Sequence, residues 1–94
     1  VYKRQQEAIN HSDATILDVR REDEFEEGHV PNSINIPLHD VPDNIDRIRA
    51  MSTPLVLCCK SGGRSGQALL LLKSQGLTEL QNGGGYTDVL KLKK

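Results

Sequence analysis

Short apolar runs alternate along the chain with charged or glycine-rich stretches. The most apolar runs, ATILDV and TPLVLCC, are bounded by polar residues, which is the pattern of buried strands. Isoleucines alternate with Asn35 in the segment between Pro31 and Pro37, and this favours a further, short strand. The predicted strands are therefore Ala14–Val19, a strand within Pro31–Pro37, Thr53–Cys59 and Thr78–Asn82.

The segments between these strands show sequence patterns that are typical of helices. One apolar stripe has Pro42 near its start, and a leucine-rich stripe ends at Gly76. A glutamate-rich segment is predicted to form a helix of one to two turns, which Gly28 closes in a left-handed conformation. The predicted helices are Tyr2–Asn10, Arg21–His29, Asp40–Met51, Arg64–Gln75 and a last turn in Thr87–Leu92.

Strands and helices alternate, and no tight hairpin signal joins two strands. This order predicts one domain over residues 1–94, with three α/β/α layers and a mainly parallel sheet of four strands, or five. Ligands bind such sheets beyond the carboxyl ends of the strands. Cys59 ends the most apolar strand, so any site is expected there.

Composition excludes several classes of protein. The 94 residues suit a single soluble domain, and the net charge of −1 provides no basic field, so nucleic acid is not an expected partner. The longest apolar run, ALLLL, is far shorter than the roughly 20 residues that span a bilayer, so we expect no membrane partner. His11, His29 and His39 lack the spacing of metal ligands, so neither a metal nor another cofactor is expected.

The segment CKSGGRSG is the strongest candidate for chemistry. Adjacent cysteines do not form an ordinary disulfide, and Cys58 and Cys59 are expected to face opposite sides of a strand. After Cys59, a glycine-rich turn and a helix N-terminus aim backbone N–H groups at the sulfur, while Lys60 and Arg64 add positive charge. Taken alone, the segment is equally compatible with a reactive thiolate and with a simple turn.

Three segments resemble the motifs of the rhodanese family. LDVRREDEFEEGHVPNSINIPL resembles its Asp-x-Arg, acidic-helix, Gly-His-Val-Pro and Asn-Ile-Pro signature. CKSGGRSGQA resembles the family's active loop with the following helix, and NGGG resembles its closing glycine turn. The resemblance spans roughly residues 14–90. It is greatest to the small single-domain sulfurtransferases, including the phage-shock protein E type.

The resemblance implies a bacterial, monomeric thiosulfate sulfurtransferase. Cys59 is then the nucleophile that carries sulfur as a persulfide, from a small anionic donor such as thiosulfate to cyanide or another thiophilic acceptor. The substrate-binding residues that it implies are Lys60, Ser61, Gly62, Gly63, Arg64 and Ser65. The family usually has an extra N-terminal strand, for which this chain starts too late, so four core strands are expected.

Two other functions have to be compared with sulfur transfer. A related phosphatase branch has five residues between its cysteine and arginine, whereas four separate Cys59 from Arg64, so we expect no phosphatase activity. A non-catalytic binding or redox-sensing module is the second alternative, although such modules often lose the cysteine. A reactive thiolate suits the cytoplasm, or the periplasm if a signal peptide has been removed.

Several residues have a structural interpretation. Asp18 and Arg20 either border the site or tie neighbouring loops together, and the second role is favoured. His29 is expected to satisfy loop backbone groups, and Cys58 to belong to the core. The glycines Gly83–Gly85 are expected to form a turn beside the active loop.

Overall fold

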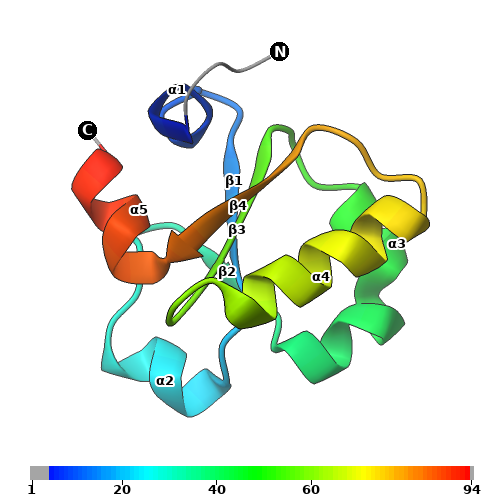
Figure 1. The fold of residues 1–94 in the computed structure, drawn as a ribbon, viewed down its shortest axis with the longest axis horizontal. Coiled ribbons are helices and arrows are strands. Elements are labelled where there is room, and N and C mark those ends of the chain that lie inside the picture. The colour runs from blue at the N-terminus through cyan, green and yellow to red at the C-terminus, as the bar shows by residue number, and fades with distance from the viewer. Residues whose placement is uncertain (1–4, 94) are drawn as a thin grey trace.

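Strands and helices alternate along residues 5–93, which are the residues that the computed structural model describes (Figure 1). The strands are β1 (Thr15–Asp18), β2 (Ile34–Asn35), β3 (Leu55–Cys59) and β4 (Leu80–Gly85). The α-helices are α1 (Gln5–Ile9), α2 (Glu22–Glu27), α3 (Ile45–Arg49), α4 (Gly63–Ser74) and α5 (Tyr86–Leu92), and η1 (Leu38–Asn44) is a 3-10 helix. None of the helices described in residues 5–93 is long and apolar enough to cross a bilayer.

Within the described residues, the four strands form one sheet in the order β2-β1-β3-β4, and every pair is parallel. Strand β3 lies inside the sheet, between β1 and β4, and all five of its residues are buried. A continuous apolar run is what a strand needs when both of its faces are covered. The predicted α/β class with a four-stranded parallel sheet is therefore confirmed.

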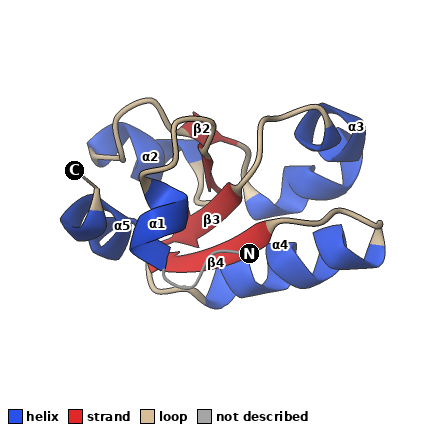
Figure 2. Cartoon of the chain, turned by 90° about the horizontal axis from the view of Figure 1, so that it is seen from above, coloured by secondary structure: helices blue, strands red, loops and turns tan. Residues whose placement is uncertain are grey.

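Alternate residues of β3 enter two separate cores. Leu55, Leu57 and Cys59 pack in one core, which lies on the side of α3 and α4, whereas Val56 and Cys58 pack in the other, on the side of α1 and α5. Figure 2 shows these helices on the two sides of the strands. The period of two along a strand thus gives the adjacent cysteines different surroundings, as the sequence predicts.

The single helix predicted over Asp40–Met51 is wrong. The chain instead forms η1, with Pro42 inside it, followed by the short helix α3. Proline has no backbone N–H and cannot continue an α-helical hydrogen-bond ladder, and the α-helix begins only after it, at Ile45. Helix α4 ends one residue before the predicted Gln75, and Gly76 follows with φ of 85°. Tyr2–Arg4 of the predicted first helix lie outside the described residues.

The prediction of a left-handed Gly28 is also wrong. Gly28 follows α2 with φ of 163°, which is extended backbone. Its N–H donates to the carbonyl of Phe25 (3.2 Å), and its own carbonyl accepts from Nη2 of Arg20 (2.7 Å). The buried Arg20 guanidinium thus fixes the direction of the chain after α2, which no local signal in the sequence encodes.

Candidate active site

Cys59 is the last residue of β3, at the carboxyl edge of the sheet, and only 1% of its surface is exposed. The loop that follows turns back over the sulfur before α4 begins at Gly63. The turn depends on Gly62, which has φ of 100°, a conformation that residues with a Cβ rarely adopt. The loop therefore encloses the side chain that precedes it.

Hydrogen-bond donors converge on the Cys59 sulfur. The backbone N–H of Gly62 donates to Sγ (3.0 Å), and the Ser65 hydroxyl lies 3.5 Å from it. Burial raises the pKa of Cys59, but hydrogen bonds from the Ser65 hydroxyl and from the N–H groups of Ser65, Ser61 and Gly62 outweigh it, so that the pKa is lowered. The loop thus stabilises a thiolate without a histidine partner.

Asn82, on β4, connects the loop to the sheet. Its Oδ1 accepts a hydrogen bond from the N–H of Gly84 (2.9 Å) and lies 2.7 Å from the Ser65 hydroxyl oxygen, while its Nδ2 donates to the carbonyl of Gly62 (3.2 Å). Asn82 therefore contacts both Gly62 and Ser65, whose hydrogen-bonding atoms lie 3.0 and 3.5 Å from the sulfur. The sequence by itself predicts no role for Asn82, because nothing local shows that β4 lies beside the active loop.

The glycines Gly83–Gly85 belong to β4, so the prediction of a turn is wrong, but Gly84 and Gly85 do lie against the active loop. A Cβ on Gly85 would lie only 2.6 Å from the carbonyl oxygen of Lys60. A Cβ on Gly83 would lie 2.8 Å from Cγ2 of Val89. Glycine at these positions lets β4 continue pairing with β3 while the loop and α5 approach its backbone.

The two cations of the loop differ in their surroundings. The Arg64 guanidinium makes two hydrogen bonds to the Glu24 carboxylate (2.6 and 3.0 Å), and this pair lowers the pKa of Glu24 to about 2. Lys60 is exposed and makes no ion pair with any residue in the range 5–93. The sequence predicts positive charge from Lys60 and Arg64 at the active loop. Because Glu24 of α2 pairs with Arg64, the charge of Arg64 is neutralised, whereas that of Lys60 is not.

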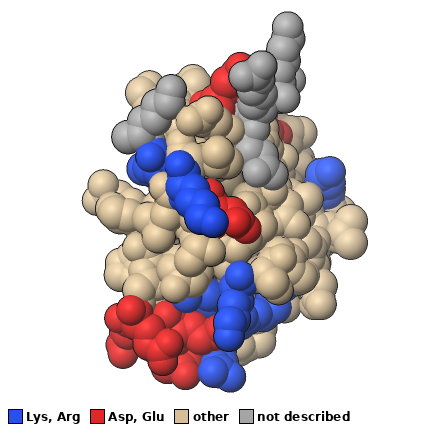
Figure 3. Space-filling model, turned by 60° about the vertical axis from the view of Figure 1, so that its left-hand side comes forward, with Lys and Arg blue, Asp and Glu red and all other residues tan. Residues whose placement is uncertain are grey.

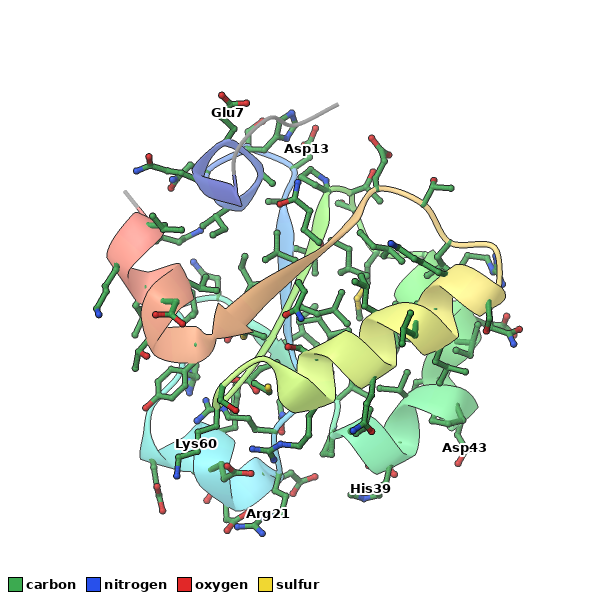
Figure 4. The ribbon with its side chains drawn as sticks, viewed as in Figure 1. Glu7, Asp13, Arg21, His39, Asp43 and Lys60 are labelled. Carbon is green, nitrogen blue, oxygen red and sulfur yellow. The ribbon has the colours of Figure 1, made fainter. Side chains whose placement is uncertain are left out.

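Helix α2, which supplies the carboxylate that pairs with Arg64, is rich in acidic residues. Its residues include Glu22, Asp23 and Glu24, and α2 lies at the same end of the molecule as the loop between β3 and α4 (Figure 1). Figure 3 shows acidic side chains gathered at this end beside basic ones. Lys60 and Arg21 lie along the same edge in Figure 4, whereas Glu7 and Asp13 lie at the opposite end.

Asp18 and Arg20 form a buried ion pair beneath the loop. Nη2 of Arg20 lies 2.7 Å from Oδ2 of Asp18, and the two side chains are 3% and 0% exposed. Arg20 also donates to the carbonyls of Glu24 and Gly28, and its guanidinium lies 3.8 Å from the centre of the Tyr86 ring. This geometry fits the predicted orienting role, because the pair fixes α2 and the start of α5 relative to β1.

The remaining candidates lie in the core, in the loop after α2 and around the active loop. Cys58 is buried in the core on the side of α1 and α5, and burial raises its pKa to about 12. His29 stacks on Phe25, and its Nδ1 lies 2.7 Å from the Phe25 carbonyl oxygen. Gly63 lies in the first turn of α4, and Ser61 is exposed. Among residues 5–93, no group of three or more His, Cys, Asp or Glu side chains could hold a metal ion.

Comparison with known proteins agrees with this arrangement. The model of the rhodanese-like domain family matches residues 2–92. The chain is 34% identical over 74 residues to thiosulfate sulfurtransferase PspE of Escherichia coli, covering 78% of this chain and 71% of that protein. It is 32% identical over 83 residues to thiosulfate sulfurtransferase GlpE of Pseudomonas syringae, covering 87% of this chain and 77% of that protein.

A solved structure described as rhodanese with anions, from E. coli, superimposes with a TM-score of 0.71 at 32% sequence identity. The match covers 80% of this chain and 89% of that one. The fold agrees with this match, and the chain belongs to the family of rhodanese-like domains.

Proposed function

We propose that the protein is a sulfurtransferase that carries sulfur as a persulfide on Cys59, with thiosulfate or a similar anionic molecule as the donor. The observation that carries the proposal is the convergence of loop N–H donors and the Ser65 hydroxyl on the buried Cys59 sulfur, with a lowered pKa as the result. The names of the related sulfurtransferases from E. coli and P. syringae support it.

In the first step, the Cys59 thiolate attacks the outer sulfur of thiosulfate. A new S–S bond forms to Cys59, the S–S bond of thiosulfate breaks, and the electron pair of that bond leaves with sulfite. The exposed ammonium group of Lys60 offers the uncompensated charge that attracts a dianion to the loop. Lys60 therefore has the larger role in donor binding, since the charge of Arg64 is shared with Glu24.

In the second step, the terminal sulfur leaves to a thiophilic acceptor. Cyanide attacks it, the S–S bond to Cys59 breaks, and thiocyanate departs while Cys59 returns to the thiolate. The N–H groups of the loop that stabilise the thiolate are placed to stabilise the persulfide anion as well. Because the loop is anchored by Asn82, these donors need little rearrangement between the two steps.

Mass spectrometry of the intact protein tests the proposal. After incubation with thiosulfate and removal of the donor, we expect the wild-type protein to gain the mass of one sulfur atom. Cys59→Ala should gain none, whereas the matched variant Cys58→Ala should still gain one. Absence of the adduct on the wild type, together with no thiocyanate from thiosulfate and cyanide, would refute the enzyme and favour the non-catalytic module.

A further inference from the structure

A pocket of about 350 Å³ lies next to the active loop. It is lined by Val19, Arg21, Pro37, Leu38, His39 and Arg64. Arg21 and His39 mark its position in Figure 4, at the end of the molecule where Lys60 of the active loop also lies. The pocket thus opens at the carboxyl edge of the sheet, where ligands of parallel sheets bind.

Two residues that line the pocket also belong to, or pack against, the core that contains Cys59. Val19 belongs to the same buried core as Cys59, and Leu38 packs against that core. Arg64 is in the first turn of α4, directly after the loop that encloses the sulfur. A molecule in the pocket therefore lies against Arg64, at the start of α4 directly after the Cys59 loop.

The lining favours an apolar body over an anion. Val19, Pro37 and Leu38 contribute no side-chain hydrogen-bond donor or acceptor. The two guanidinium groups of the rim already have partners: Arg64 bonds to Glu24, and Arg21 bonds to Asp23 (3.1 and 3.2 Å). Displacing these carboxylates for a small anion would break existing ion pairs, whereas an apolar group would leave them intact.

The volume is adequate for a ring-sized group. A cavity of about 150 Å³ is enough to hold benzene, so the pocket accommodates an aromatic ring together with a short substituent. Cyanide and thiosulfate are much smaller and carry charge, so neither would fill it or use its apolar floor. The pocket is therefore distinct in chemistry from a site for the donor.

We propose that this pocket binds the sulfur acceptor, and that the preferred acceptor is a small organic thiol with an uncharged, apolar body. The proposal rests on the proposed persulfide function. The acceptor thiolate attacks the terminal sulfur of the Cys59 persulfide, a bond forms between the acceptor sulfur and that atom, and the S–S bond to Cys59 breaks. The products are the persulfide of the acceptor and the Cys59 thiolate, without any oxidant or reductant.

Transfer kinetics give the first test. Protein is loaded with thiosulfate and offered benzyl mercaptan or 2-mercaptoethanol, whose thiol groups have similar acidity but whose bodies are apolar and polar. We expect the KM for benzyl mercaptan to be at least about tenfold lower, from burial of the ring. Leu38→Asn should remove this preference and leave transfer to cyanide unchanged, whereas Leu70→Asn, at a position 69% exposed on α4, should keep it. Equal KM values in the wild type would overturn the proposal.

A binding measurement separates the pocket from the chemistry. Benzyl methyl sulfide has the same body but no thiol to accept sulfur, and its binding can be followed by the amide NMR signals of Val19, Leu38 and His39. We expect saturable shifts in the wild type and in Cys59→Ala, and none in folded Leu38→Asn. If these shifts appear while no persulfide forms, the pocket binds the apolar group but the proposed sulfurtransferase function is refuted. If persulfide forms but these signals do not move, the acceptor pocket is refuted.

Discussion

Ser65 offers a direct test of how the loop activates Cys59. Its hydroxyl is the largest of the contributions that lower the Cys59 pKa, ahead of the backbone N–H groups. In Ser65→Ala that donor is lost, while the backbone donors, including the N–H of Gly62, remain. We therefore expect the pH profile of thiolate formation to move to higher pH.

The magnitude follows from the geometry. A hydrogen bond to a charged group contributes about 1.5–3 kcal/mol, and the separation of 3.5 Å between the Ser65 and Cys59 side chains places this one at the low end. A loss of about 1.4 kcal/mol is a factor of ten, so the thiolate fraction below the pKa should fall about tenfold. Folding stability should change by about 1 kcal/mol or less, because Asn82 still accepts from Gly84 and Gly62 still accepts from Gly66.

The assay is the rate of alkylation by iodoacetamide between pH 5 and about pH 9, with the modified residue identified by mass. Cys58 does not interfere, because its pKa is raised to about 12 whereas that of Cys59 is lowered, so that Cys58 stays a thiol over this pH range. Ser74→Ala is the matched control, since Ser74 lies at the far end of the same helix and bonds only to Leu71 among the described residues. If Ser65→Ala is alkylated at pH 7 as fast as the wild type, the hydroxyl does not stabilise the thiolate.

Three further predictions follow from the site. Gly85→Ala places a Cβ 2.6 Å from the Lys60 carbonyl oxygen, so urea unfolding should show a loss of about 1–3 kcal/mol together with slower persulfide loading. Asp18→Asn leaves the buried Arg20 charge without its ion pair, and we expect urea unfolding to show a loss of about 3 kcal/mol. Aryl phosphate hydrolysis should stay at background, and activity that disappears in Cys59→Ser would contradict this.

Matched substitutions make the two stability predictions specific. Gly63→Ala introduces a Cβ with no heavy atom within 4 Å, at a helical position, so it should be neutral or stabilising by up to about 1 kcal/mol. Asp23→Asn removes a partner of Arg21 from an exposed pair, both of whose side chains are more than 60% exposed, and should leave the free energy of unfolding nearly unchanged. Losses as large as those of Gly85→Ala and Asp18→Asn would show that the crowding and burial arguments are wrong.

Local patterns predicted most of the architecture. The apolar run that ends at Cys59 indicates a strand covered on both faces, and the glycines after it indicate a turn into a helix. Both features depend on neighbours within a few residues, so the sequence displays them. Two of the errors have different origins: the spacing around Pro42 suggests a helix start although Pro42 lies inside a 3-10 helix, and the glycine signal at Gly28 is overridden by its contact with the buried Arg20.

By itself, the sequence determined the class of fold, the strand that carries the cysteine, the opposite orientations of Cys58 and Cys59, and the family. Only the tertiary structure decided which groups meet at the sulfur and its rim. Asn82 is 17 residues from Ser65, and Glu24 is 40 residues from Arg64, yet both pairs are in hydrogen-bond contact. Parallel strands bring such distant segments to one edge of a sheet, and a side chain's partners there are set by that packing rather than by its neighbours in sequence.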